Sequence, residues 1–120
     1  MKRLAAIYPE DAYEMVVNSE LDLGEFLALI LYDDAYFKKI CEKLSSYHNL
    51  NRMLPLIKDF TIEMSEYDGK NGLVKLAYQA FYKFYEGTTD EEVIRNFYTN
   101  VSFTIDTNSK QLVFWFPLFS

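Results

Sequence analysis

Hydrophobic residues recur at helical spacing through residues 10–48 and then give way to an alternating pattern. Residues 9–20 predict a short helix, because Pro9 fits the first helical turn and the acids that follow it suit the positive end of the helix dipole. A second helix begins after Asp22, which stands three residues before Glu25 in the spacing of a capping box. Its apolar stripe predicts that this helix is largely buried; the stripe consists of Leu23, Phe26, Leu27, Ile30 and Leu31.

The stripe is interrupted at Asp34, where helical spacing requires an apolar residue, and it resumes at Phe37. We therefore predict a break at Asp33–Asp34, with Asp34 capping a third helix over residues 35–47. One continuous helix, with Asp34 at the exposed edge of the stripe, is the alternative.

Alternation predicts the first strand, over residues 59–67, where Phe60, Ile62 and Met64 point to one side and polar residues to the other. The Asp68–Gly69 and Asn71–Gly72 pairs that follow predict a chain reversal.

The next two segments are assigned to helices. Residues 73–87 have polar residues at every fourth position, which fits a helix face and a strand face alike. We favour a helix ending at Gly87, since two alanines support it; a long strand paired with residues 58–66 is the alternative. Residues 88–98 predict a short helix, because Thr89 and Glu92 have capping-box spacing.

The C-terminal segment, residues 101–119, predicts a β-hairpin with a two-residue loop at Asn108–Ser109. One face of this hairpin is apolar and joins three cross-strand pairs: Ile105 with Leu112, Phe103 with Phe114, and Val101 with Phe116. Val113 and Trp115 fall on the other face beside polar residues, so we expect either a helix or a binding partner to cover them.

Together these elements predict a single α+β domain over residues 1–120, with N-terminal helices packed on a small antiparallel sheet of three or four strands that ends in the C-terminal β-hairpin. The N-terminus lacks the apolar run of a signal peptide, and no segment has the roughly 18 apolar residues of a membrane span. The single Cys41 needs no oxidising compartment. We therefore expect a cytoplasmic protein that does not engage a membrane.

Catalytic, metal and nucleotide motifs are not recognisable in the sequence. Cys41 and His48 are two helical turns apart, about 10 Å along a helix axis, too far for a catalytic pair. One Cys and one His are too few for a structural zinc site, and the acids at 33–34 do not follow the calcium-loop pattern. The glycines at 69 and 72 lack phosphate-loop spacing. We expect no cofactor, no metal and no enzymatic activity.

Charge is distributed unevenly along the chain, whose formal net charge is −6. Eight acids and no Lys or Arg lie between Leu4 and Asp34, whereas ten acids and ten bases follow from Ala35 onward. Direct nucleic-acid binding is disfavoured in this acidic chain, because affinity for phosphates depends on clustered Lys and Arg side chains. The chain also has 10 tyrosines, a residue enriched at interface hot spots.

Acidic surfaces steer association with basic proteins. We therefore predict a non-enzymatic acidic binding protein, an inhibitor or immunity-type protein that blocks a basic protein such as a nuclease toxin or a nucleic-acid-binding effector. The predicted partner-binding residues are Glu14, Asp22, Glu25, Tyr32, Asp33, Tyr36 and Trp115. One alternative is a structural or homo-oligomeric subunit that uses Val113, Trp115 and the tail as its contact. Another is a small-ligand-binding protein or enzyme with an aromatic pocket.

Overall fold

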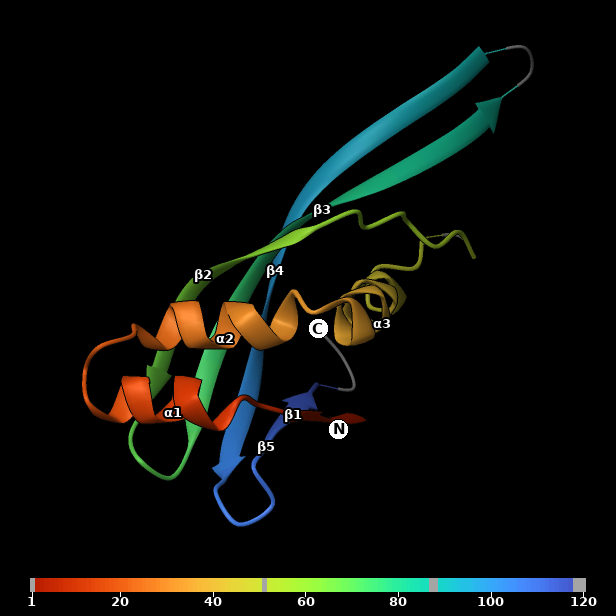
Figure 1. Ribbon diagram of the computed structural model, residues 1–120. Coiled ribbons are helices and arrows are strands. Elements are labelled where there is room, and N and C mark those ends of the chain that lie inside the picture. The colour runs from red at the N-terminus through yellow and green to blue at the C-terminus, as the bar shows by residue number, and fades with distance from the viewer. Residues whose placement is uncertain (1, 51, 87–88, 118–120) are drawn as a thin grey trace.

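A computed structural model describes residues 2–50, 52–86 and 89–117. The described chain contains three helices and a five-stranded antiparallel sheet of strand order β1-β5-β4-β3-β2 (Figure 1). The elements are β1 (Lys2–Ile7), α1 (Glu10–Val17), α2 (Leu23–Leu31), α3 (Asp34–Ser46), β2 (Phe60–Tyr67), β3 (Gly72–Glu86), β4 (Thr89–Asp106) and β5 (Gln111–Phe116). The predicted α+β class is confirmed, but the prediction of three or four strands is wrong.

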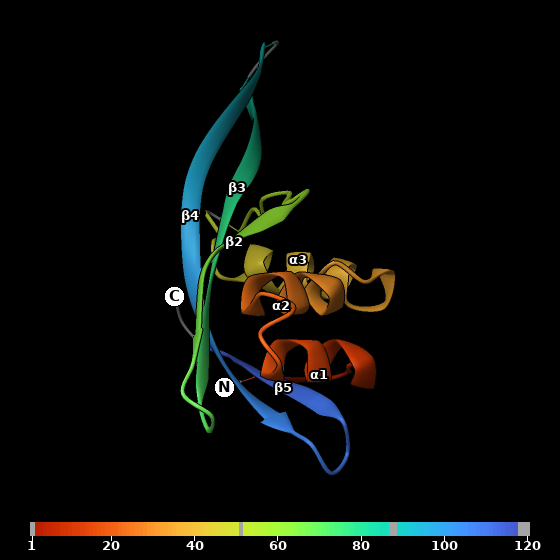
Figure 2. The same cartoon turned by 60° about the vertical axis from the view of Figure 1, so that its left-hand side comes forward.

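All three helices lie on one face of the sheet, which we call the covered face, and the described helices leave the opposite, open face bare (Figure 2). Alternation along β3 reflects these two environments: Val74, Leu76 and Ala80 are buried, whereas Gln79 and Lys83 are exposed. The core between helices and sheet is closed by large side chains from both layers, including Phe26, Leu27, Ile40, Leu44, Phe60, Phe103 and Phe114.

The three helices predicted before the chain reversal are confirmed, with small shifts at their starts. α1 begins at Glu10, so Pro9 is its N-cap residue rather than its first helical residue. Asp22 caps α2 as predicted, because its carboxylate accepts a hydrogen bond from the Gly24 backbone N–H at 3.1 Å. The break between α2 and α3 is also confirmed, but its cap is Asp33, which accepts from Ala35 N–H at 2.9 Å. The prediction of Asp34 as the cap is wrong by one residue.

The two helices predicted after the chain reversal are wrong, because residues 72–86 and 89–106 form strands. β3 and β4 pair in unbroken register from Gly72 opposite Phe103 to Glu86 opposite Thr89. β-branched and aromatic residues that alternate between two faces favour a strand over the helix propensity of two alanines. Glu92 lies opposite Lys83 and does not complete a capping box. Gly87, the predicted helix end, lies outside the described residues.

β2 is confirmed and pairs with β3, but a bulge between Ile62 and Met64 changes which side chains face the helices. Beyond this bulge Ser65 and Tyr67 take the covered face, and Met64 is exposed instead of lying beside Ile62. The extra residue therefore overturns the predicted alternation from Met64 onward.

The C-terminal hairpin is confirmed with two of its predicted pairs, Phe103 with Phe114 and Ile105 with Leu112. Its ladder stops at Ser102 opposite Trp115, so the third predicted pair is not part of it. The loop is longer than predicted, because pairing begins only at Asp106 opposite Gln111 and leaves residues 107–110 to form the turn.

β1 was not predicted, and it explains the burial of Val113. This strand pairs with β5 so that Ala5 lies opposite Val113 and Arg3 opposite Trp115. Val113 is 6% exposed, and Trp115 is half-buried with the Arg3 guanidinium 5.8 Å from its ring centroid. A neighbouring strand therefore flanks these two residues, and the described helices lie on the other face of the sheet (Figure 2).

β3 and β4 continue past the other strands as a two-stranded arm (Figure 1). The arm makes the molecule elongated, with principal dimensions of 58 × 25 × 23 Å. The radius of gyration is 16.4 Å, above the value of about 14 Å expected for a compact chain of this length.

Candidate interaction surfaces

The eight acids of the N-terminal region are all exposed, and they lie on or next to α1, α2 and the first turn of α3. We call this set the acidic helical surface: Glu10, Asp11, Glu14, Glu20, Asp22, Glu25, Asp33 and Asp34. α1 and α2 lie side by side over the covered face (Figures 1 and 2). The acids that are clustered in the sequence therefore also lie on one side of the molecule, the side with the helices.

Two of these acids are held in place by the backbone, since Asp22 and Asp33 cap α2 and α3 while remaining exposed. Glu10 is paired with Lys110 of the β4–β5 loop at 2.6 Å, and this hydrogen bond raises the pKa of Lys110. The loop lysine thus offsets one charge at the edge of the acidic helical surface.

The tyrosines predicted to bind a partner also hold the helices against the sheet. Tyr32 is 39% exposed, and its hydroxyl donates a hydrogen bond to the Phe60 carbonyl. Its ring stacks on Phe60 with centroids 5.0 Å apart, and burial is the largest cause of its raised pKa. The half-buried Tyr36 accepts a hydrogen bond from Ile7 N–H at 3.4 Å. Each tyrosine thus combines a packing contact with an accessible part.

The predicted residues do not form one surface. Glu14, Asp22, Glu25, Tyr32 and Asp33 belong to α1, α2 and their caps, and Tyr36 follows on α3. Trp115 pairs with Ser102 and alternates with the buried Phe114, so it lies on the open face, whereas the helices lie on the other face of the sheet (Figure 2). A single flat interface on the helices therefore does not include Trp115.

Cys41 and His48 do not form a catalytic pair in the structure. Cys41 is buried, and burial raises its pKa to about 11, so its thiol stays protonated near neutral pH. His48 follows the end of α3 and is half-buried, with its ring 3.7 Å from Phe97 in a stacked arrangement. Burial lowers the pKa of His48.

His48 instead joins a hydrogen-bonded network on the covered face. Its Nε2 lies 2.6 Å from the Tyr78 hydroxyl, which in turn lies 2.7 Å from the Thr99 hydroxyl. Tyr82 donates to the His48 carbonyl at 2.6 Å. This network ties the segment after α3 to β3 and β4. Sequence reasoning missed it, because the partners come together only through strand register.

The open face pairs three aromatic rings with cations. The charged nitrogen of Lys75 is 4.1 Å from the Tyr98 ring centroid, and that of Lys58 is 4.3 Å from Phe81. Arg3 lies over Trp115 in the same way. Lysine and arginine stems can cover apolar rings while their charges stay in water, so these pairs lower the apolar exposure of the open face.

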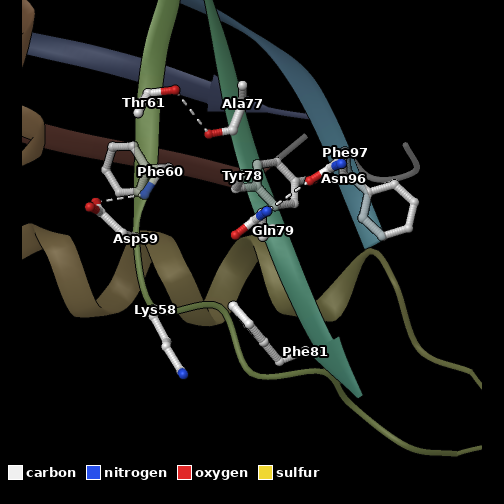
Figure 3. A pocket seen from close by; sticks show the side chains of 10 residues that line it. All are labelled: Lys58, Asp59, Phe60, Thr61, Ala77, Tyr78, Gln79, Phe81, Asn96 and Phe97. Carbon is white, nitrogen blue, oxygen red and sulfur yellow. Dashed lines mark hydrogen bonds between the residues drawn. The ribbon is translucent and has the colours of Figure 1, made fainter. Parts of the chain in front are cut away.

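A shallow cleft of about 560 Å³ crosses β2, β3 and β4 beside the Lys58–Phe81 pair (Figure 3). Its polar side chains are engaged with the protein: the Thr61 hydroxyl donates to the Ala77 carbonyl at 3.4 Å, and the Gln79 amide donates to the Asn96 side-chain oxygen at 3.1 Å. Lys58 and Asp59 also line the cleft, and the Asp59 carboxylate accepts a hydrogen bond from the Phe60 backbone N–H at 2.7 Å.

Within the described ranges, no group of three or more His, Cys, Asp and Glu side chains is arranged to hold a metal ion. None of the helices in the described part of the chain is long and apolar enough to span a membrane.

Comparison with known proteins adds no relative: no family model matches the chain, and neither a curated protein nor a solved structure matches it significantly. The functional argument therefore depends on the surfaces described above.

Proposed function

We propose that the protein is a non-enzymatic binding protein whose acidic helical surface blocks a basic site on another protein, as an inhibitor or immunity-type protein does. One observation carries this proposal: eight exposed carboxylates on or next to α1, α2 and the first turn of α3, in a stretch that contains no Lys or Arg. No positively charged side chain within this stretch therefore neutralises its carboxylates.

A surface of one sign attracts an oppositely charged partner over a distance and raises the association rate by about 10-fold to 10³-fold at low ionic strength. Nuclease toxins and nucleic-acid-binding effectors hold phosphates with clustered Lys and Arg side chains, so the carboxylates of an inhibitor can occupy the same basic site. Backbone hydrogen bonds fix Asp22 and Asp33, so less side-chain freedom is lost when they are bound.

The proposed contact consists of Glu14, Asp22, Glu25 and Asp33, with the exposed part of Tyr32 as an aromatic anchor and Tyr36 at its margin. Trp115 lies outside such a contact. We place the protein in the cytoplasm, where an unpaired thiol such as Cys41 is stable. Its partner is a protein, and it does not bind nucleic acid directly.

The test compares three tagged proteins as baits in lysate of the source organism. The first is wild type, and the second is a Glu14→Lys, Asp22→Asn, Glu25→Lys, Asp33→Asn variant, in which asparagine preserves both helix caps. The third, a matched control with the same change in charge, is Glu63→Lys, Asp68→Asn, Glu66→Lys, Asp106→Asn. Its asparagines keep the turn hydrogen bonds that Asp68 and Asp106 accept.

Captured proteins are identified by mass spectrometry after low-salt and high-salt washes. We expect a basic protein that wild type and the control retain at low salt and that the helical variant loses. The proposal is abandoned if wild type captures no basic protein, or if the helical variant and the control retain it equally.

A further inference from the structure

Two opposite charges near the end of the protruding arm have no ion-pair partner among the described residues. Glu91 and Arg95 are exposed, lie on the same face of β4, and are opposite uncharged residues of β3. Four residues along a strand span about 13 Å, so the two side chains do not meet within one chain. Glu92 differs from them, since it lies opposite Lys83.

The strand that carries these charges has an unpaired edge. β5 pairs with β4 only from Ser102 to Asp106, and no described strand pairs with the preceding part of β4 on that side. We call residues 89–97 the β4 outer segment. It contains no Pro or Gly and pairs with β3 without a register shift. An edge of this kind can accept another strand.

The hydrogen-bond pattern of the sheet shows which peptide groups of the β4 outer segment point outward. Tyr8 N–H donates to the Lys110 carbonyl, so even-numbered residues of β1 bond to even-numbered residues of β5. Antiparallel pairs alternate, so the odd-numbered residues of β5 bond to their partners on β4, which have even numbers. The N–H and C=O groups of Glu92, Ile94 and Asn96 therefore point away from β3, toward an added strand.

Antiparallel pairing with a second copy brings the two unpaired charges together. A two-fold axis at Val93, perpendicular to the sheet, places Glu91 of each copy opposite Arg95 of the other copy. Glu92 and Ile94 then lie opposite each other and can exchange two backbone hydrogen bonds, since the peptide groups of both point outward. The pairing therefore forms two ion pairs and leaves no outward peptide group between them unpaired.

The ladder between β4 and β5 limits the possible registers. With the axis at Val93, Thr89 of the second copy lies opposite Phe97, which precedes the first residue paired with β5, Ser102. An axis at Asn96 would instead place the second copy on residues that β5 already occupies. The axis must therefore lie nearer the end of the arm.

Charge selects among the registers that remain. An axis at Glu91, Glu92 or Arg95 places a charged residue opposite itself, and like charges in this position are destabilising. An axis at Ile94 places Glu91 and Arg95 opposite uncharged residues. Only the axis at Val93 pairs both charges within the β4 outer segment.

We infer that two copies of the chain form an antiparallel dimer about Val93, in which the β4 outer segments pair and the two arms become one four-stranded ribbon. Such a ribbon is more stable than an isolated two-stranded arm. The dimer is independent of the proposed function, since the acidic helical surface lies on or next to α1, α2 and the first turn of α3.

Charge reversal tests the two ion pairs by sedimentation velocity. Glu91→Arg and Arg95→Glu should each raise the dimer Kd at least ~10-fold, because each variant places like charges opposite each other twice. An equimolar mixture of these two variants should associate about as tightly as wild type, because the charges that meet are then opposite. Glu66→Arg, the same change in charge at an exposed position of β2, should leave the Kd unchanged.

Disulfide trapping tests the position of the axis. The two copies of residue 93 form a pair without hydrogen bonds, with Cα atoms about 4.5 Å apart, within the disulfide range of about 4.4–6.8 Å. The test variant is Val93→Cys in a Cys41→Ser background. The control is Asn96→Cys in the same background, whose two copies lie about 20 Å apart along the ribbon. We expect mild oxidation to yield a covalent dimer, twice the 14.2 kDa chain mass, from the Val93→Cys variant only.

Circular dichroism checks that each variant retains the sheet. Three results would each overturn the dimer about Val93. They are a wild-type protein that is monomeric at every concentration, equal trapping of the two cysteine variants, and a mixture of Glu91→Arg and Arg95→Glu that associates no better than either variant alone.

Discussion

The two faces of one sheet show how this chain separates stability from surface chemistry. On the covered face, rings pack against one another, as Phe103 does with Tyr67 and Phe114 at centroid distances of 5.8 and 5.9 Å. On the open face, rings pack under cations, as Tyr98 does under Lys75. Alternate side chains of one strand therefore differ in role: on β4, Phe103 excludes water from the core, and Tyr98 stays at the surface.

The largest expected difference between the faces comes from truncating one ring on each. Phe103→Ala should lower the free energy of unfolding by about 3–5 kcal/mol, because a fully buried ring leaves a cavity. Tyr98→Ala should cost under ~1 kcal/mol, because this ring is mostly exposed. Urea titration measures both values at a protein concentration low enough to exclude self-association. Equal losses would show that the faces do not differ as described.

Gly72 tests how tightly the covered face is packed. A Cβ added at this position would lie 2.2 Å from the Phe103 ring, so Gly72→Ala should destabilise the protein by roughly 1–3 kcal/mol. Adding Phe103→Leu to Gly72→Ala should recover part of this loss, because the smaller side chain makes room. A double variant whose loss equals the sum of the two single losses would contradict the close approach of Gly72 and Phe103.

Tyr47 offers a stabilising change on the helix side. Its hydroxyl is buried, it has no hydrogen-bond partner among the described residues, and burial raises the pKa of Tyr47 to about 12. Tyr47→Phe should therefore raise the free energy of unfolding by about 1 kcal/mol. The matched control is Tyr82→Phe, which removes the hydrogen bond to the His48 carbonyl and should destabilise by a similar amount. Destabilisation by Tyr47→Phe would contradict the assignment of an unsatisfied hydroxyl.

The smallest expected effect is a pH dependence caused by His48. Burial lowers the pKa of His48 in the folded state, so the unfolded chain binds this proton more readily. Above the ordinary histidine pKa of about 6.5, neutral His48 leaves the free energy of unfolding at its full value. That free energy decreases as the pH falls through about 6.5 toward the lowered pKa of the folded state. Unfolding measured between pH 8 and pH 5 should show a smaller loss for His48→Gln than for wild type. Identical pH profiles would rule out His48 as the cause.

Local signals made the three N-terminal helices predictable. The caps and the apolar stripe of α2 identify a helix without any knowledge of distant contacts, and Asp33–Asp34 marks the break before α3. The exposure of the acids in the acidic helical surface could also be predicted, because carboxylates are rarely buried without a partner.

The strands from Gly72 to Asp106 were mostly missed because their signal is not local. Polar residues at every fourth position fit both a helix and every second outward position of a strand, and only pairing between β3 and β4 decides between them. The residues of β1 are few and alanine-rich, so pairing with β5 identifies this strand where its sequence does not. Trp115 was predicted to share the partner contact with the acids, because the hairpin pattern does not show that the helices lie on the opposite face of the sheet.

The proposed role of the acidic helical surface is tested most directly by the rate at which the captured basic partner associates with the purified protein as salt is varied. Stopped-flow measurements should give fast association that falls steeply with ionic strength for wild type and for the matched control. The helical variant, Glu14→Lys, Asp22→Asn, Glu25→Lys, Asp33→Asn, should associate at least ~10-fold more slowly at low salt, with a flatter salt dependence. Equal association rates and equal salt slopes for all three proteins would contradict the proposed role of these carboxylates.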